Sequence, residues 1–253
     1  DYVNPFVGTD GYGNVYPGAQ IPFGGIQISP DTDSHFYDAA SGYKYSHHTL
    51  LGFSLTHLSG TGIPDLGDFL FMPGTGTLHL EPGSHEHPES GYRSRYSHER
   101  EWATPNYYAV ELTDYGVKAE MTSGKRSGMF RFTYPQSDSA FILIDMNHTL
   151  WQTCEWANLR MENDSTLSGY KLVKGWGPER HVYFKAVFSK KFSDLLFMQA
   201  GKPVIYDTSR FRSRREAWGK GLMACIRFAT TEREEVTVKV AISSVSTDGA
   251  TGN

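Results

Sequence analysis

The second half of the chain alternates between apolar and polar residues over short stretches, and this pattern predicts β-strands. Alternation runs through residues 107–112, 130–134, 181–188 and 236–242, whereas residues 141–144 are continuously apolar. Alternation is typical of a strand with one buried face, and a short apolar run is consistent with a strand buried on both faces. Groups of Gly, Pro, Asp and Ser separate the runs, as turns between strands require.

Helical periodicity is weak along the whole sequence, and the one modest helical pattern covers residues 212–220. Many short strands at close spacing, with turns that contain Gly and Pro, favour a sandwich or a barrel. We therefore predict an all-β fold, an antiparallel β-sandwich.

Residues 1–100 depart from this rhythm, because they hold many of the glycines, prolines and histidines and fewer clean strands. Long ordered loops inside a compact domain usually have a function. No linker and no internal repeat divides the sequence. We expect residues 1–253 to form a single domain with long N-terminal loops.

Composition argues against two classes of partner. The net charge is −4 over 253 residues, whereas proteins that bind nucleic acid carry a basic surface. No apolar run reaches the roughly 18 residues that a membrane-spanning helix needs. The two cysteines, Cys154 and Cys225, lack the spacing of a zinc site and either form one disulfide or remain two thiols.

The densest polar chemistry lies in residues 52–72, GFSLTHLSGTGIPDLGDFLFM. Two strand-like runs flank a connection that contains hydroxyls, glycines, His57, Asp65 and Asp68. A hairpin needs only about two to five loop residues, so this connection is longer than a turn requires. Dense polar loops on a rigid scaffold are where ligand contacts tend to lie. His57 in this loop either contacts a ligand or braces the loop.

Motifs along nearly the whole chain, in order, carry a family resemblance. They are VNPFVGT (3–9), YPGAQIPFG (16–24), SPDT (29–32), SGYKYS (41–46), HLSGTGIPDLGD (57–68), NYYAVELTDYGVKAEMT (106–122), GWGPERHVYFKAVFSK (175–190) and AISSVSTDGA (241–250). This set resembles the N-terminal domain of the family 92 glycoside hydrolases, which are bacterial exo-acting α-mannosidases.

The resemblance implies an architecture and an activity. In the family a β-sandwich precedes a larger (α/α)6 barrel that supplies the catalytic carboxylates, and this sequence stops where that barrel would begin. The expected reaction is the removal of terminal α-linked mannose from glycans by single-displacement inversion. The resemblance also implies the missing barrel and a mannose-containing glycan as partners, and an exported, periplasmic or cell-surface, bacterial protein.

The family pattern also implies substrate-binding residues in three loops. They are Tyr12, Gly13, Asn14, Tyr37, Asp38, His57, Ser59, Gly60, Thr61, Gly62 and Asp65. The chain departs from the pattern at Tyr12 and Asn14, where relatives often carry histidines. It departs again at Tyr37, where α-1,2-specific relatives commonly carry a Trp that packs on the leaving sugar.

No catalytic residue is expected in this chain. Two aspartates three residues apart in a loop, such as Asp65 and Asp68, can reach the roughly 6.5–9.5 Å separation of an inverting pair, but Asp residues in such loops more often cap turns. The family's acid and base lie in the barrel.

No metal or cofactor is expected here either. The sequences His47-His48, His85-Glu86-His87 and His98-Glu99 have no third ligand at a fixed spacing. Calcium, which needs six to eight oxygen ligands, is expected only in the complete enzyme, among barrel residues.

Two other readings remain open from the sequence. A stand-alone carbohydrate-binding module would show an exposed aromatic platform and would bind sugar without the barrel. A purely structural docking domain would show a large apolar patch and no sugar binding.

Overall fold

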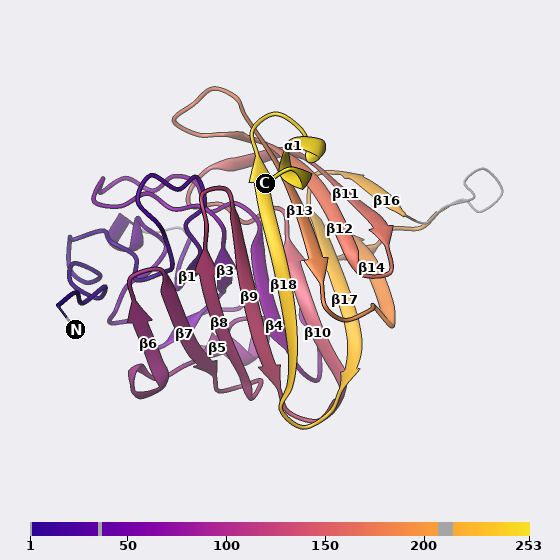
Figure 1. The fold of residues 1–253 in the computed structure, drawn as a ribbon, viewed down its shortest axis with the longest axis horizontal. Coiled ribbons are helices and arrows are strands. Elements are labelled where there is room, and N and C mark those ends of the chain that lie inside the picture. The colour runs from indigo at the N-terminus through magenta and orange to yellow at the C-terminus, as the bar shows by residue number, and fades with distance from the viewer. Residues whose placement is uncertain (1, 35–36, 207–214) are drawn as a thin grey trace.

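Two antiparallel sheets stacked face to face form the body of the molecule (Figure 1). The computed structural model describes residues 2–34, 37–206 and 215–253. The first sheet has seven strands in the order β1 (Ser29–Asp31), β3 (Gly52–Ser54), β4 (Leu70–Gly74), β10 (Ser137–Asp145), β17 (Leu222–Thr230), β14 (Asp194–Gln199) and β15 (Lys202–Pro203). The predicted all-β sandwich is therefore confirmed.

The second sheet has nine strands. Their order is β16 (Glu216–Gly219), β11 (Thr153–Asn163), β12 (Thr166–Lys174), β13 (Arg180–Phe188), β18 (Glu234–Ser243), β9 (Ser127–Tyr134), β8 (Val117–Ser123), β7 (Tyr107–Leu112) and β6 (Glu101–Thr104). A small separate sheet pairs β2 (Thr49–Leu50) with β5 (Ser94–Arg95). The helical elements are η1 (Tyr37–Ala39), η2 (Pro88–Ser90), η3 (His98–Arg100) and α1 (Thr247–Thr251).

Alternating strands place their apolar residues between the two sheets. On β18 the residues Val236, Val238, Val240 and Ile242 are buried, while their neighbours are not. The continuously apolar run falls in β10, at the centre of its sheet, and every residue from Ala140 to Asp145 is buried there. The alternating pattern in the sequence thus indicates which strands have one face exposed to solvent.

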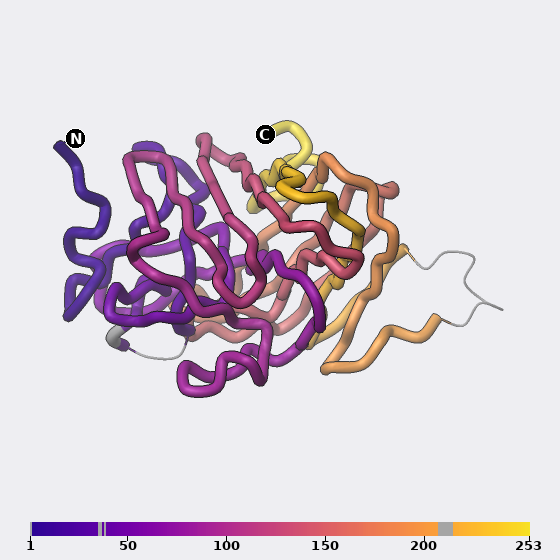
Figure 2. Tube along the Cα trace, turned by 90° about the horizontal axis from the view of Figure 1, so that it is seen from below, coloured from indigo at the N-terminus to yellow at the C-terminus, as the bar shows by residue number. Residues whose placement is uncertain are grey.

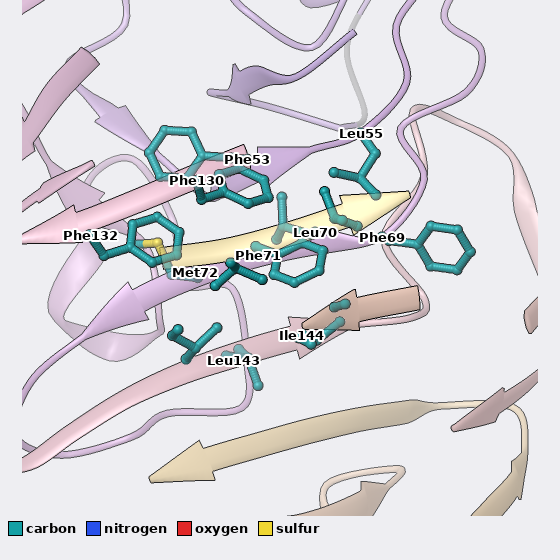
Figure 3. Packing of buried hydrophobic residues seen from close by; sticks show 14 of the residues in the cluster. Phe53, Leu55, Phe69, Leu70, Phe71, Met72, Phe130, Phe132, Leu143 and Ile144 are labelled. Atoms are coloured by element: carbon teal, nitrogen blue, oxygen red, sulfur yellow. The ribbon is translucent and has the colours of Figure 1, made fainter. Parts of the chain in front are cut away.

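Aromatic rings from the two sheets meet in the core. Figure 3 shows β4 residues next to β9 residues, and the Phe71 and Phe130 ring centroids are 5.1 Å apart. Phe69 lies 4.6 Å from Phe184 of β13. Such tilted pairs add specific packing to the area that they bury, and they fix β4 against the nine-stranded sheet. The polar connection that precedes β4 is thereby held at one end by a packed strand.

The N-terminal third gathers at one end of the long axis, and β14 and β15 lie toward the other (Figures 1 and 2). Backbone hydrogen bonds tie these loops to one another and to the sandwich. Ala19 and Ile28 form an isolated bridge, and Tyr45 N donates to Thr9 O at 2.9 Å.

Two expectations from the sequence need comment. The helical pattern at residues 212–220 is wrong where it can be judged. Glu216–Gly219 is strand β16, which pairs with β11 in the register Leu159↔Ala217, while residues 207–214 lie outside the described residues. Sheet pairing overrides a weak local helical preference. Of the alternatives for the cysteines, the structure has two free thiols, Cys154 partly exposed and Cys225 buried.

The close contact between β12 and β13 gives a stability prediction. A Cβ on Gly169 would lie 2.3 Å from the Phe184 ring, whereas one on Gly177 would meet nothing within 4 Å. We expect Gly169→Ala to cost about 1–3 kcal/mol of unfolding free energy, as overpacking of a core does. Gly177→Ala is the matched control. Denaturant unfolding that gave both variants the same midpoint would contradict this packing.

Candidate functional site

A pocket of about 690 Å3 opens between the polar connection and the C-terminal segment. Its lining includes Thr56, His57, Asp68, Arg126, Arg180 and Asn253. The chain end and α1 lie at the same edge of the sandwich (Figure 1). Residues far apart in the sequence therefore converge here because β4, β13 and β18 all end or begin at this edge.

A fully buried carboxylate, Asp68, lies beneath the pocket. Arg180 binds it through both terminal nitrogens, with Nη1 2.6 Å from Oδ2 and Nη2 3.1 Å from Oδ1. Lys171 Nζ lies 3.2 Å from Oδ1, and the Thr56 hydroxyl donates to Oδ2 at 2.7 Å. The two-pronged arginine contact is the strongest geometry available to a carboxylate. Asp68 thus holds the connection before β4 against β12 and β13.

A second buried carboxylate, Asp31 at the end of β1, lies between two histidines. His57 Nε2 is 2.8 Å from Oδ1 and His148 Nε2 is 2.7 Å from Oδ2. Gly42 packs directly on Oδ1: a Cβ at this position would lie 2.0 Å away, and its φ is +89°. Only glycine fits both the left-handed backbone and this close approach.

Lys171 joins the two carboxylate clusters. Its ammonium donates to the backbone carbonyl of His148 at 2.7 Å and also faces Asp68. The side chain is fully buried and lies over the Phe69 ring, 5.3 Å from the centroid. A buried ammonium is tolerated only when it is paired and hydrogen-bonded. We call Asp31, His57, His148, Asp68, Lys171 and Arg180 the buried polar network.

The charges of the network keep both carboxylates ionised. Burial alone would raise the pKa of Asp68, but Lys171 and Arg180 outweigh it and hold the pKa below its usual range. Burial would also raise the pKa of Asp31. The charge of His57 and the hydrogen bond from His148 outweigh burial and lower this pKa below its usual range. A general acid needs a raised pKa, so neither carboxyl fits that role.

His57, predicted from its loop position, has a fully buried side chain. Its Nδ1 lies 2.8 Å from the carbonyl of Gln27, and its Nε2 faces Asp31 and the Ser54 hydroxyl. Both ring nitrogens therefore have partners within the protein. Of the two roles considered for His57, this geometry favours the brace over direct contact with a ligand.

Two of the three predicted loops lie side by side. Gly60 N donates to Asn14 O at 2.7 Å, and the Asn14 side-chain nitrogen lies 3.5 Å from the position of a Cβ on Gly62. Tyr12 is 94% exposed, and Gly13 follows it in the same turn. Ser59 and Thr61 are also exposed. The structure thus brings residues 12–14 and 59–62 together on one surface.

The remaining predicted residues lie elsewhere or act locally. Tyr37 is exposed in η1 and, among the described residues, forms no hydrogen bond with either loop. Asp38 belongs to the same turn, but its side chain is outside the described residues. Asp65 Oδ1 accepts from Leu66 N at 2.9 Å, which is the contact of a turn cap.

The donor set of the network does not fit a calcium ion. Asp31 and Asp68 are the buried carboxylates beside the pocket, and each already faces cationic or hydrogen-bonding partners on both oxygens. Calcium requires six to eight oxygen ligands. Within the described residues no group of three or more His, Cys, Asp or Glu side chains is arranged for a metal.

Sequence reasoning missed four members of the network, namely Asp31, His148, Lys171 and Arg180. Asp31 and Arg180 fall in the SPDT and GWGPERH motifs, which signalled the family but not a role. Lys171 is a charged residue among apolar neighbours in a strand, and this is the one local signal that a buried ion pair was present. The pairings themselves join residues more than 100 positions apart.

Acid should weaken the protein through this network. Because the folded-state pKa of Asp68 is below its unfolded-state value, its stabilising contribution is present above pH ~4 and is lost as pH falls toward the folded-state pKa. We expect Asp68→Asn to lose about 3–5 kcal/mol of unfolding free energy at pH 7, as breaking a buried pair does. The difference in unfolding free energy between wild type and this variant should become smaller below pH ~4. Asp65→Asn is the control. A difference in unfolding free energy between wild type and Asp68→Asn that did not change with pH would contradict the ionised pair.

Comparison with known proteins identifies the chain. Residues 2–243 match the family model described as the glycosyl hydrolase family 92 N-terminal domain. The solved family GH92 α-mannosidase BT3965 from Bacteroides thetaiotaomicron is 81% identical, with a TM-score of 0.97 over all of this chain and 34% of that chain. This chain thus spans about a third of that relative.

More distant relatives agree in fold. The inverting mannosidase BT2199 from Bacteroides thetaiotaomicron is 24% identical, with a TM-score of 0.81 over 100% of this chain and 32% of that one. An uncharacterized secreted glycosidase from Arthroderma benhamiae is 28% identical over 152 residues, 57% of this chain and 19% of that protein. No helix in the described residues has the length and apolar character needed to cross a membrane. The chain belongs to the glycosyl hydrolase family 92 N-terminal domain family.

Proposed function

We propose that this chain forms one wall of the sugar pocket of an α-mannosidase that removes terminal α-linked mannose with inversion. The observation that carries the proposal is the 690 Å3 pocket where the polar connection meets the C-terminal segment. The 81% identical relative is named an α-mannosidase, and a second structure of it is described as a complex with mannoimidazole. The substrate class of this chain is inferred from those names.

Residues 12–14 and 59–62, which we call the rim loops, supply the substrate contacts in this proposal. Tyr12, Ser59 and Thr61 have exposed side chains, and Gly13, Gly60 and Gly62 belong to the same two loops. The second of these loops directly follows His57 and Leu58, which line the pocket. Asn14 belongs to the same surface, Tyr37 and Asp38 contribute from the separate η1 turn, and Asp65 serves as a turn cap. His57 acts beneath them as a brace, because its ring is fully buried. The buried polar network then fixes the loops, so that binding costs little ordering entropy.

The missing partner is the C-terminal barrel. Several large apolar side chains in the first 25 residues of the chain are exposed, among them Val7, Tyr12 and Phe23. Exposed apolar groups that gather on one surface mark interaction sites. Asn14 Oδ1 is buried without a hydrogen-bond partner among the described residues, which a covering domain or an ordered water would satisfy. These observations support a docked domain over this end of the sandwich.

The proton-transfer groups belong to that barrel. Inversion needs a protonated carboxyl on the leaving oxygen and a carboxylate that activates water on the opposite face of the ring. Asp31 and Asp68, the buried carboxylates beside the pocket, have pKa values held below their usual range and so are poorly suited to donate a proton. We place the acid, the base and any calcium in the barrel, with residues 1–253 as one domain of an exported enzyme.

Activity measurements test this division of roles. Residues 1–253 alone should not hydrolyse aryl α-mannosides, whereas the protein extended by its C-terminal domain should. Asp65→Asn in the extended protein should retain turnover, since Asp65 caps a turn. Turnover by residues 1–253 that disappeared in Asp65→Asn or Asp68→Asn would move catalysis into this chain. Sugar binding by residues 1–253, with no hydrolysis by the extended protein, would favour a stand-alone binding module.

The brace role of His57 gives a second test in the extended protein. His57→Ala leaves Asp31 short of one buried partner, which costs about 1–3 kcal/mol and lowers Tm by roughly 2–4 °C per kcal/mol. We expect kcat/KM of the folded fraction to stay close to wild type. His87→Ala, at an exposed histidine, is the control. An unchanged Tm with a fall in kcat/KM would assign His57 to substrate contact instead.

A further inference from the structure

A row of aromatic and amide side chains crosses the outer face of the nine-stranded sheet. The strand registers place Trp218 opposite Asn158, Asn158 opposite Tyr170, and Tyr170 opposite Tyr183. These four residues lie on β16, β11, β12 and β13 in spatial order (Figure 1). Side chains in one such row share a face of the sheet. We call Trp218, Asn158, Tyr170 and Tyr183 the aromatic row.

The row presents ring faces to the solvent. Trp218 is 57% exposed, and Trp156, its diagonal neighbour on β11, is 46% exposed. The rings of Tyr170 and Tyr183 lie 4.8 Å apart at an angle of 35°. Trp218 and Tyr170 are two strands apart, which is about 9.5 Å. Each indole keeps about half of its surface in contact with solvent, so part of each ring is available to a ligand.

A groove of about 270 Å3 runs along the row. All four row side chains line it, together with polar groups that include Arg160, Glu162 and Glu216. Asn158 Nδ2 donates to Glu216 Oε1 at 3.1 Å, and the Ser168 hydroxyl donates to Glu162 Oε1 at 2.6 Å. The polar side chains are therefore held in place by one another. The Trp218 indole remains exposed, whereas the half-buried Tyr170 ring packs against both Tyr183 and His181.

The charge of the groove selects against anionic ligands. Its guanidinium, Arg160, lies opposite Glu216 in register, and Arg160 Nε is 3.6 Å from Glu162 Oε2. The positive charge is thus matched by carboxylates and offers little to a phosphate or an acidic peptide. An uncharged ligand with one apolar face and many hydroxyls fits better, because rings pack on its apolar face while amide and carboxylate groups bind its hydroxyls.

We propose that the aromatic row is a second glycan-binding site that takes a short stretch of a neutral oligosaccharide. Two strand spacings between Trp218 and Tyr170 suit a ligand of about two sugar rings, one on the Trp218 indole and the next beside Tyr170. The site lies on the outer sheet face and shares none of its groove-lining residues with the pocket. It would hold a polysaccharide on the enzyme while the pocket acts on a chain end.

Affinity electrophoresis of the extended protein tests the site. Native gels that contain yeast α-mannan or laminarin, a neutral β-glucan, report binding as retardation. We expect wild type to be retarded by at least one of them and Trp218→Ala to bind about tenfold more weakly, the order of loss when a central Trp is truncated. Trp218→Phe should retain most of the binding, since it keeps a ring face.

Trp176→Ala is the matched control, because Trp176 is 65% exposed and lies in the 175–178 turn outside the row. It should bind like wild type. Hydrolysis of a small aryl α-mannoside should be unchanged in all these variants, since it reports only the pocket. Retardation that depends on Trp218 in a protein without mannosidase activity would uphold this site and reject the proposed function. No retardation by either glycan, or equal retardation of wild type and Trp218→Ala, would overturn the site.

Discussion

The bidentate pair between Asp68 and Arg180 is the interaction on which the functional end of the sandwich depends. It joins the strand after the polar connection to β13, and Lys171 extends it to His148 and so to Asp31. Removing one partner of a buried pair destabilises a protein more than replacing both partners with apolar residues, since it leaves a lone charge in the apolar interior. The network therefore enforces one arrangement of loops that lack regular structure of their own.

This arrangement explains why so many polar residues near the pocket are not free to do chemistry. His57 has both ring nitrogens engaged, and the two carboxylates are kept ionised by cationic neighbours. A rigid base beneath exposed rim residues separates support from recognition. Binding sites benefit from such support because a loosely held contact loses affinity to disorder.

The sequence predicted the sandwich because its strands carry a clear period of two, and residues 107–112 match β7 at both ends. It failed at β16, where a short strand is defined by its partner β11 and not by its own residues. The polar connection was found because its composition exceeds what a turn needs. The network was not found, because Asp31–His148 and Asp68–Arg180 each join positions more than 100 residues apart. The local pattern of apolar and polar residues does not indicate which distant residues will pair.

The two rim loops are joined by a backbone hydrogen bond, from Gly60 N to Asn14 O. A contact between main-chain atoms does not depend on which side chains stand nearby. Tyr12, Ser59 and Thr61 point into solvent beside it. Mutation at these three positions can therefore change the shape and hydrogen bonding of the rim while the path of the chain stays the same. A scaffold of this kind can accept new side chains on this surface in single steps, without first passing through an unstable intermediate.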